Sequence, residues 1–245
     1  MRTILIVIYL LFFFILGLPV LAVDWLIRKR YPEFSAHAQL RIVQWAFRCI
    51  CFMAGLKLTV IGKENVPKDE AVLYIGNHRG FFDIVVTYML CPRLTGYIAK
   101  SGINKVPVLR VIMGRLYCLF LDRDDIKQGL QVILKAIDYV KNGISICIFP
   151  EGTRNTDNEH PESLLPFKDG SFQIAQKTGC PIVPMAIIGT ADVFENHLPW
   201  IKSTKVTLVY GKPIRMNELE KDDQKHIGSY CHDVIQQMLI DQLSS

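Results

Sequence analysis

The sequence lacks the features that mark several common kinds of catalytic or structural centre. It contains no Gly-x-Ser-x-Gly run, which is the nucleophile elbow of the α/β-hydrolases. Its one close cysteine pair, Cys49 and Cys51, has neither a second pair nor a group of histidines nearby, so a zinc site is not expected there. Internal repeats and low-complexity tracts are absent as well. These absences argue against a serine-elbow hydrolase, a zinc domain and a repeat protein.

The cysteines are also too scattered to suggest a disulfide framework. There are seven in 245 residues, an odd number, and most lie inside apolar segments. This pattern predicts small buried side chains in a reducing compartment. The net charge of +5 agrees with an anionic partner such as lipid headgroups, phosphate or coenzyme A, although an ordinary basic surface explains it nearly as well. We expect no nucleic-acid partner.

The longest run without charge lies at the amino terminus. Residues 3–23 contain no charged side chain and are just long enough, as a helix, to cross a hydrocarbon core of about 30 Å. A basic triplet follows at residues 28–30, against a lone Arg2 before the run. This asymmetry predicts a retained anchor with the catalytic domain on the cytoplasmic face of the membrane. The alternative is a cleaved signal peptide, since Pro19 interrupts the run and residues 20–22 suit a cleavage site.

The next segment, residues 36–53, has the spacing of an amphipathic helix, with apolar side chains at steps of three and four residues. The apolar positions are Leu40, Val43, Phe47 and Ile50, and Arg41 and Arg48 lie one heptad apart. We interpret the segment as a helix in the headgroup layer. With the anchor and a bend at Pro32 it would form a two-helix membrane-docking element, residues 1–56, before a catalytic domain, residues 57–245. The alternative is a helix packed on the core of that domain.

From residue 57 onwards, strand and helix patterns alternate. This order predicts an α/β fold with a largely parallel mixed sheet flanked by helices. The strands are expected at residues 58–61, 71–75, 97–99, 117–121, 145–149, 182–188 and 205–210. The helices are expected at residues 84–90, 108–114, 127–140, 171–178 and 222–243. The last helix should cover the sheet, and the polar, proline-containing residues 156–166 should form a mobile loop.

A histidine and an aspartate five positions apart lie between the predicted strand 71–75 and the helix 84–90. Residues at this spacing do not share a helix face, so contact requires His78 in the turn and Asp83 in the first helical turn, folded back toward it. Gly80 allows the turn to be tight, and the helix dipole favours a carboxylate there. The arrangement makes His78 a general base oriented by Asp83. A lone pair at this spacing is more often a coincidence, so the prediction depends on its context.

That context is a second polar group placed after other predicted strands. Ligand sites of open α/β sheets gather at the carboxyl ends of strands, and arginine binds phosphate oxygens well. The residues that follow strand ends in this way are Lys100, Arg123, Glu151, Gly152, Thr153 and Arg154. Each alone would more often belong to a surface ion pair. Together we expect them to face one pocket with His78.

These blocks resemble the glycerolipid acyltransferase family, and within it the 1-acylglycerol-3-phosphate (lysophosphatidic acid) acyltransferases. The matching runs are Asn77-His78 with Asp83, and residues 120–123, 149–154, 165–172 and 182–186. They occur in the family's order over roughly residues 57–211. Residues 99–103 depart from the family's usual Lys-x-Glu-Leu and contain no glutamate, so no role of that residue is carried over to this chain.

The resemblance implies transfer of a fatty acyl chain from acyl-CoA or acyl carrier protein to the 2-hydroxyl of 1-acylglycerol 3-phosphate, giving phosphatidic acid. It implies His78 and Asp83 as the catalytic pair, with no metal and no bound cofactor. Arg123 and residues 151–154 would bind the glycerol phosphate, helped by Lys100. The expected partners are membrane lipids, lysophosphatidic acid and the acyl donor.

Three alternatives stay open from the sequence. The enzyme could use another acceptor, such as glycerol 3-phosphate, another lysophospholipid or an amino-acid lipid. It could be a membrane-bound thioesterase or hydrolase in which His78 activates water. It could also be a catalytically silent membrane adaptor, against which the intact His78, Asp83, Glu151 and Arg154 argue.

Overall fold

The computed structural model describes residues 1–244, and within them a seven-stranded sheet forms the centre of the molecule. The strands lie in the order β1-β7-β6-β2-β5-β3-β4. Their bounds are β1 Lys57–Ile61, β2 Leu73–Gly76, β3 Thr95–Lys100, β4 Leu119–Leu121, β5 Ser145–Ile148, β6 Ile182–Ile188 and β7 Lys205–Tyr210. Strands β6, β2, β5, β3 and β4 run parallel, whereas β7 is antiparallel to β6 and carries β1 parallel to itself. The predicted α/β fold with a largely parallel mixed sheet is confirmed.

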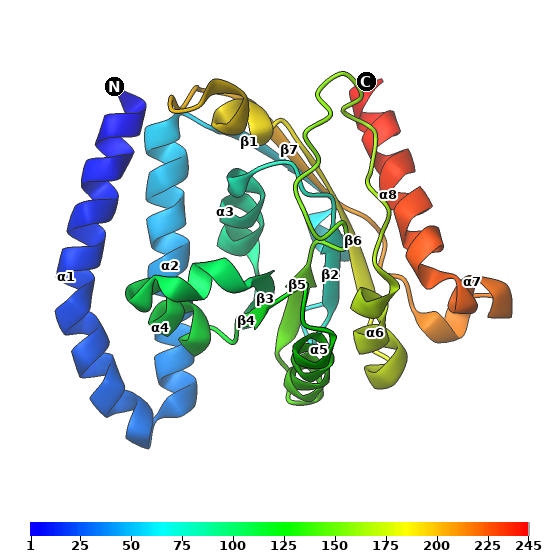
Figure 1. Ribbon diagram of the computed structural model, residues 1–245, viewed down its shortest axis with the longest axis horizontal. Helices are drawn as coiled ribbons and strands as arrows, with labels where there is room; N and C mark the ends of the chain where they lie inside the picture. The colour runs from blue at the N-terminus through cyan, green and yellow to red at the C-terminus, as the bar shows by residue number, and fades with distance from the viewer. Residues whose placement is uncertain (245) are drawn as a thin grey trace.

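Helices cover both faces of this sheet (Figure 1). On one face lies α3, Phe81–Leu90; on the other lie α5, Ile126–Lys141, α6, Gln173–Thr178, and α8, Ile227–Leu243. Successive strand residues point to opposite faces. In β2, Tyr74 accordingly packs in the cluster that contains α3, while Leu73 and Ile75 pack in the cluster that contains α5 and α8. Because β6, β2, β5, β3 and β4 run parallel, their carboxyl ends lie at one edge of the sheet.

The first two helices form a hairpin beside the domain. Helix α1 spans Arg2–Arg30 and α2 spans Pro32–Ala54, so the chain reverses at Tyr31. Proline suits the first position of a helix, and Pro32 holds that position in α2, as the predicted bend requires. Figure 1 shows α1 on the outside, running antiparallel to α2 along most of its length. Most apolar side chains of α1 are exposed.

The apolar face of α2 packs on the domain, which corrects the interpretation that it lies in the headgroup layer. Leu40 and Ile50 are buried in the cluster that contains α3, and Phe47 packs against it, with its ring 5.9 Å from that of Tyr88. The side-chain amide of Gln44 also donates to the carbonyl of Cys91, at 2.8 Å, just beyond the end of α3. The alternative in which α2 packs on the core is the one the structure shows.

A buried ion pair fastens the hairpin to helix α4, Pro107–Arg115. The guanidinium of Arg115 lies 2.7 Å from the carboxylate of Asp24 in α1, and both side chains are about nine-tenths buried. Ser35 of α2 donates to the same carboxylate at 2.6 Å, and Arg115 donates to the carbonyl of Leu21 at 3.1 Å. The hairpin and α4 are thus joined by charge as well as by apolar contact.

Two predicted helices differ from the observed ones. Residues 171–178 divide between a 3-10 turn, Asp169–Phe172, and α6. Residues 222–243 divide between α7, Lys221–Lys225, and α8, because His226 between them leaves the helical conformation, with φ −110° and ψ 35°. The prediction that the cysteines are small buried side chains is confirmed for six of the seven, all but Cys49. Burial raises the pKa of Cys118 and Cys231 to about 12, so both remain thiols.

Candidate active site

The loop between β2 and α3, residues 77–80 (the His78 loop), is fixed at its start by Asn77. This fully buried side chain accepts a hydrogen bond from the backbone N–H of Ile187 at 2.8 Å and donates to the carbonyl of the same residue at 2.9 Å. The amide therefore extends the pairing of β2 with β6 by one position, and the next residue leaves the sheet edge in a defined direction. That residue is His78.

The predicted contact between His78 and Asp83 is present. The Nδ1 atom of His78 lies 2.7 Å from Oδ2 of Asp83, which is fully buried in the first turn of α3. The same oxygen accepts the backbone N–H groups of Arg79, at 2.7 Å, and Gly80, at 2.8 Å. The other oxygen accepts the hydroxyl of Thr190. One carboxylate thus folds the loop, caps the helix and orients the imidazole ring.

The imidazole ring of His78 is held on its face as well as on its edge. It stacks on Phe149, with 4.5 Å between ring centroids and 14° between planes. With Nδ1 facing Asp83, the ring offers Nε2 as its free nitrogen, and no partner of Nε2 is found among residues 1–244. The side chain keeps 16% of its surface exposed. This is the geometry of a histidine general base, although its catalytic role stays a prediction.

Glu151 lies beneath the same loop and is only 4% exposed. Its two oxygens accept backbone N–H groups from His78, at 2.6 Å, and from Leu165, at 2.9 Å. Burial raises the pKa of Glu151, an effect that these two hydrogen bonds partly oppose. The carboxylate therefore ties together the His78 loop and the segment that follows β5. Contact of Glu151 with an acceptor stays a prediction, and the hydrogen bonds that the structure shows are to backbone N–H groups.

Arg79, the residue after His78, has a structural role that the sequence did not reveal. The guanidinium of Arg79 is buried and donates to backbone carbonyls of Asp157, His160, Pro161 and Ser163. These carbonyls belong to the segment 156–166, predicted to be a mobile loop. In the structure, the hydrogen bonds of Arg79 hold this segment against the His78 loop.

Arg154 is connected to the same loop through Glu195, a second residue that the sequence did not reveal. Its guanidinium lies 2.9 Å from Oε1 of Glu195, and that oxygen also accepts the backbone N–H of Phe81 at 2.7 Å. Glu195 stands beyond the end of β6, 41 residues from Arg154 and 114 from Phe81 in the chain. Only the fold brings these residues together, so no local pattern could have found them.

Gly152 and Thr153 complete the turn between Glu151 and Arg154. Gly152 has φ +71°, a left-handed conformation that favours glycine. A Cβ atom at this position would lie 3.0 Å from Cε and Nζ of Lys168, whose side chain lies against the turn. Thr153 is exposed. Lys168, which lies in the matching run 165–172 but was not among the expected site residues, is therefore a further cation of this region.

Lys100 and Arg123 lie farther along the same edge. Both are exposed, Lys100 at the end of β3 and Arg123 just after β4. These strands stand two and three places from β2, which corresponds to roughly 10 and 14 Å between backbones. The structure thus places Arg154 by hydrogen bonds beside the His78 loop and leaves Lys100 and Arg123 more distant. Contact of Lys100 and Arg123 with the acceptor stays a prediction.

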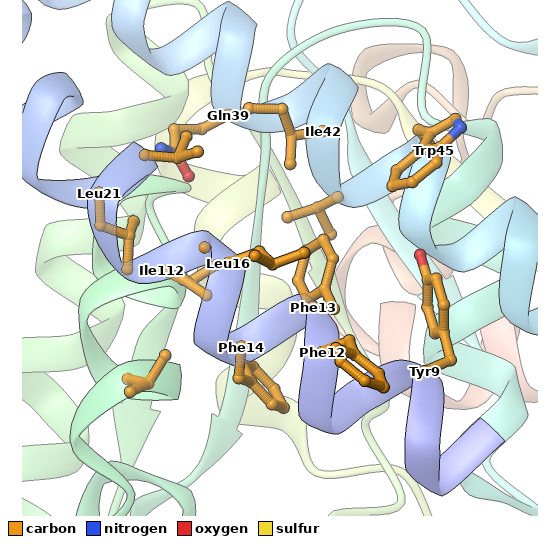
Figure 2. Close-up of a pocket in the computed structure, with 14 residues that line it drawn as sticks. Tyr9, Phe12, Phe13, Phe14, Leu16, Leu21, Gln39, Ile42, Trp45 and Ile112 are labelled. Carbon is orange, nitrogen blue, oxygen red and sulfur yellow. The ribbon is translucent and has the colours of Figure 1, made fainter. Parts of the chain in front are cut away.

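An apolar cavity of about 340 Å³ lies apart from this site, between α1, α2 and α4. Its walls include Tyr9, Phe13 and Leu16 of α1, Ile42 of α2 and Ile112 of α4, which Figure 2 shows converging on a common space. None of the lining residues belongs to the His78 loop. The size is within the range of small-molecule sites, and the walls suit a hydrocarbon.

Comparison with known proteins defines the class. A family model described as Acyltransferase matches residues 57–188, more than half of the chain. The chain therefore belongs to the acyltransferase family and is an acyltransferase by class, as the sequence blocks predict.

Among individual relatives, it is 30% identical over 186 residues to the 1-acyl-sn-glycerol-3-phosphate acyltransferase of Borreliella burgdorferi, covering 75% of this chain and 72% of that one. It is 32% identical over 189 residues to the chloroplastic 1-acyl-sn-glycerol-3-phosphate acyltransferase of Brassica napus, covering 76% of this chain and 51% of that one. The crystal structure of the 1-acyl-sn-glycerophosphate (LPA) acyltransferase PlsC from Thermotoga maritima has the same fold. Its TM-score is 0.79 at 24% identity, over 98% of this chain and 97% of that one.

Proposed function

We propose that the protein transfers a fatty acyl chain from an acyl thioester to the 2-hydroxyl of 1-acylglycerol 3-phosphate, giving phosphatidic acid. The observation that carries the proposal is the His78–Asp83 pair, with Nδ1 held at 2.7 Å and Nε2 left free. The names of the relatives support the choice of acceptor. The donor is acyl-CoA or acyl carrier protein.

The chemistry requires one base and no protein nucleophile. Nε2 of His78 takes the proton of the acceptor hydroxyl while that oxygen attacks the thioester carbonyl. Asp83 stabilises the imidazolium that forms and keeps the ring oriented. When the tetrahedral intermediate collapses, the C–S bond breaks and the new ester bond remains. The departing thiolate then takes the proton back from Nε2, which restores the neutral histidine.

The acceptor's phosphate is placed at Arg154, which is half exposed beside the His78 loop. Arginine offers two parallel donors to phosphate oxygens. The ammonium of Lys168 adds a cation at Gly152, and the exposed Lys100 and Arg123 complete a basic edge. In this proposal Glu151 supports the loop from beneath.

The apolar cavity between α1, α2 and α4 is proposed to receive an acyl chain. Its walls are almost entirely hydrocarbon and aromatic (Figure 2), with Gln39 as a polar exception. Burial of a hydrocarbon chain in such a cavity is favourable when the chain comes from water and nearly neutral when it comes from lipid, where one apolar surface is exchanged for another. The cavity therefore suits the hydrocarbon part of a substrate from either source.

We propose further that α1 anchors the enzyme in a membrane with the catalytic domain on the cytoplasmic face. This helix is long and apolar enough to cross a bilayer, and only 6% of its most apolar window is buried. A signal sequence would pass the same test of length and composition. Retention is supported by the contacts of Asp24 with Ser35 and Arg115, which make α1 part of the packed fold.

Purified full-length protein in detergent, given labelled acyl-CoA and 1-acylglycerol 3-phosphate, should yield labelled phosphatidic acid. His78→Ala should lower kcat by a hundredfold or more, on the order of the contribution of a general base. A matched control is His226→Ala, since that side chain is 55% exposed and its ring pairs, within residues 1–244, with Asp222 alone. More than a tenth of the wild-type rate in His78→Ala would contradict the assignment. Labelled free fatty acid as the main product would show a hydrolase instead.

A further inference from the structure

Arg154, the cation placed at the acceptor's phosphate, already has an anionic partner. Glu195 contributes one oxygen, Oε1, which lies 2.9 Å from the guanidinium of Arg154. The same oxygen accepts the backbone N–H of Phe81 at 2.7 Å, the first residue of α3. A carboxylate therefore already engages one nitrogen of Arg154, the side chain at which the substrate phosphate is proposed to bind.

The two partners differ greatly in their exposure. The side chain of Arg154 is 52% exposed, while that of Glu195 is 13% exposed. The second oxygen of Glu195, Oε2, is buried and has no hydrogen-bond partner within residues 1–244. Gly80 makes room for it, because a Cβ atom there would lie 2.7 Å from Oε2. A buried oxygen without a hydrogen-bond donor costs free energy. The unpaired Oε2 therefore weakens the hold of the protein on the Glu195 side chain in this position.

We propose that Glu195 exchanges with the substrate phosphate at Arg154. The carboxylate neutralises Arg154 when the site is empty, yields it to the phosphate of the acceptor, and takes it back as the product leaves. The inference rests on the proposed function, which places the acceptor's phosphate at Arg154. Beyond that function, it makes Glu195 a residue that sets the affinity of the enzyme for both acceptor and product.

The physical basis is competition between two anions for one guanidinium. A phosphate monoester carries about −1.5 to −2 charges near neutral pH, so it binds Arg154 more strongly than a single carboxylate does. The phosphate must still displace Glu195, or tolerate its negative charge nearby, and both lower its net affinity. The same competition speeds departure of the product, which keeps the phosphate. Removal of the charge from Glu195 should therefore tighten the binding of both.

The test compares Glu195→Gln with wild type in full-length protein. Glutamine keeps the shape and an oxygen that can accept from Phe81 and Arg154, but it has no charge. The KM for 1-acylglycerol 3-phosphate and the inhibition constant for phosphatidic acid should both fall by about twofold to fivefold, the scale of one partly exposed ion pair. The KM for the acyl donor should not change. Glu195→Ala should shift both constants in the same direction, which guards against a fault specific to glutamine.

Two further variants decide whether the effect runs through Arg154. Asp192→Asn removes an equal charge from an exposed position on the same segment, where the carboxylate contacts Asn196, and it should leave both constants unchanged. In an Arg154→Ala background, Glu195→Gln should have no effect on either. An unchanged or raised KM in Glu195→Gln, or an equal fall without Arg154, would overturn the proposal.

Binding of inorganic phosphate, measured by calorimetry without any acyl donor, separates this inference from the proposed function. Wild-type protein that fails to acylate 1-acylglycerol 3-phosphate would refute the proposed function alone. Tighter phosphate binding in Glu195→Gln, lost in the Arg154→Ala background, would then still support the exchange. Equal phosphate binding in wild type and Glu195→Gln would refute it, whatever the acceptor is.

Discussion

Glu151 shows how the role of a single carboxylate depends on its burial. Its two oxygens accept the N–H groups of His78 and Leu165, whereas glutamine can accept with only one. Glu151→Gln should therefore lower the free energy of unfolding by about 1–3 kcal/mol, the cost of an unpaired buried donor. Because the backbone of His78 loosens, kcat should fall more than the acceptor KM rises. Thermal unfolding and steady-state kinetics would measure both. A stable variant with a raised acceptor KM alone would instead favour direct contact between Glu151 and the acceptor.

The raised pKa of Glu151 adds a pH dependence to this comparison. A carboxyl whose pKa is higher in the folded than in the unfolded protein binds more protons when folded. Its contribution to the free energy of unfolding is therefore complete below its ordinary value of 4.5 and declines as the pH rises through the raised pKa. Glutamine lacks this contribution. The difference in stability between wild type and Glu151→Gln should narrow as the pH rises from about 4.5.

Gly152 is required by backbone geometry. Its φ of +71° is costly for other residues, by about 1–2 kcal/mol, and an alanine Cβ would press on Lys168. Gly152→Ala should lower stability by this amount and reduce activity, because it turns Glu151 and Arg154 relative to each other. Gly129→Ala is a matched control within α5, where a Cβ meets only Leu121 at 3.6 Å. That change should raise stability by about 0.5–1 kcal/mol. Equal effects of the two variants on melting temperature would contradict this reasoning.

The sequence predicts those parts of the site whose partners are near in the chain. His78 and Asp83 are five residues apart, and turn geometry decides whether they meet. Thr190 and Glu195 lie more than a hundred residues from the atoms they contact in the first turn of α3. Their contacts depend on how β6 pairs with β2, which no local pattern contains. The sequence also does not predict that Glu151 is buried and accepts backbone N–H groups, since a carboxylate at a strand end can point either to solvent or to the backbone.

At the level of helices, the pair Asp24 and Arg115 joins α1 to α4. Removal of one partner leaves the other charge buried and unpaired, which costs about 3–5 kcal/mol. Asp24→Ala should therefore lower the melting temperature strongly, measured in detergent. The double variant Asp24→Leu with Arg115→Met should recover most of the loss, since apolar pairs of similar size often replace buried ion pairs without cost. A double variant no more stable than Asp24→Ala would contradict this account.

Helix α2 shows where a correct helix prediction can give the wrong surroundings. The spacing of Leu40, Phe47 and Ile50 fixes an apolar face, but lipid and a protein core are equally apolar. What distinguishes them here is Gln44, whose amide reaches the carbonyls that end α3. Such a bond to another element indicates a protein neighbour, and it becomes visible only with the fold.

At the level of the whole molecule, α2 belongs to the domain's core, so a chain that begins at Lys57 loses more than the proposed membrane anchor. The cluster around α3 would lose Leu40, Ile50 and Ala54, all buried. We expect such a chain to aggregate, even in detergent that keeps the full-length protein monodisperse. Size-exclusion chromatography of both chains measures this. A monodisperse, cooperatively unfolding chain from Lys57 would show that the two parts fold independently.

The exposed side of α1 should govern attachment to membranes. Its apolar surface outweighs the basic triplet, because each surface charge contributes only about 1 kcal/mol, so alkaline and high-salt washes should not release the protein. Lysines at Phe12 and Leu16, which are 58% and 65% exposed, should release it, since each costs about 2.5–3.5 kcal/mol within a bilayer. Ile240→Lys, on α8 at 39% exposure, is the control. Release of wild type by salt, or retention of the double lysine variant, would contradict the anchor.

The link between α1 and α4 also sets an order of events during synthesis. Asp24 is made well before Arg115, and at ordinary rates of translation the interval is on the order of ten seconds. During that time the carboxylate of a newly made α1 has no cationic partner, which opposes its transfer into hydrocarbon. In the proposed membrane-anchored state, α1 can therefore settle fully in lipid only after α4 has left the ribosome. Helix α1 is made long before α4, yet it would be among the later elements to reach its final place.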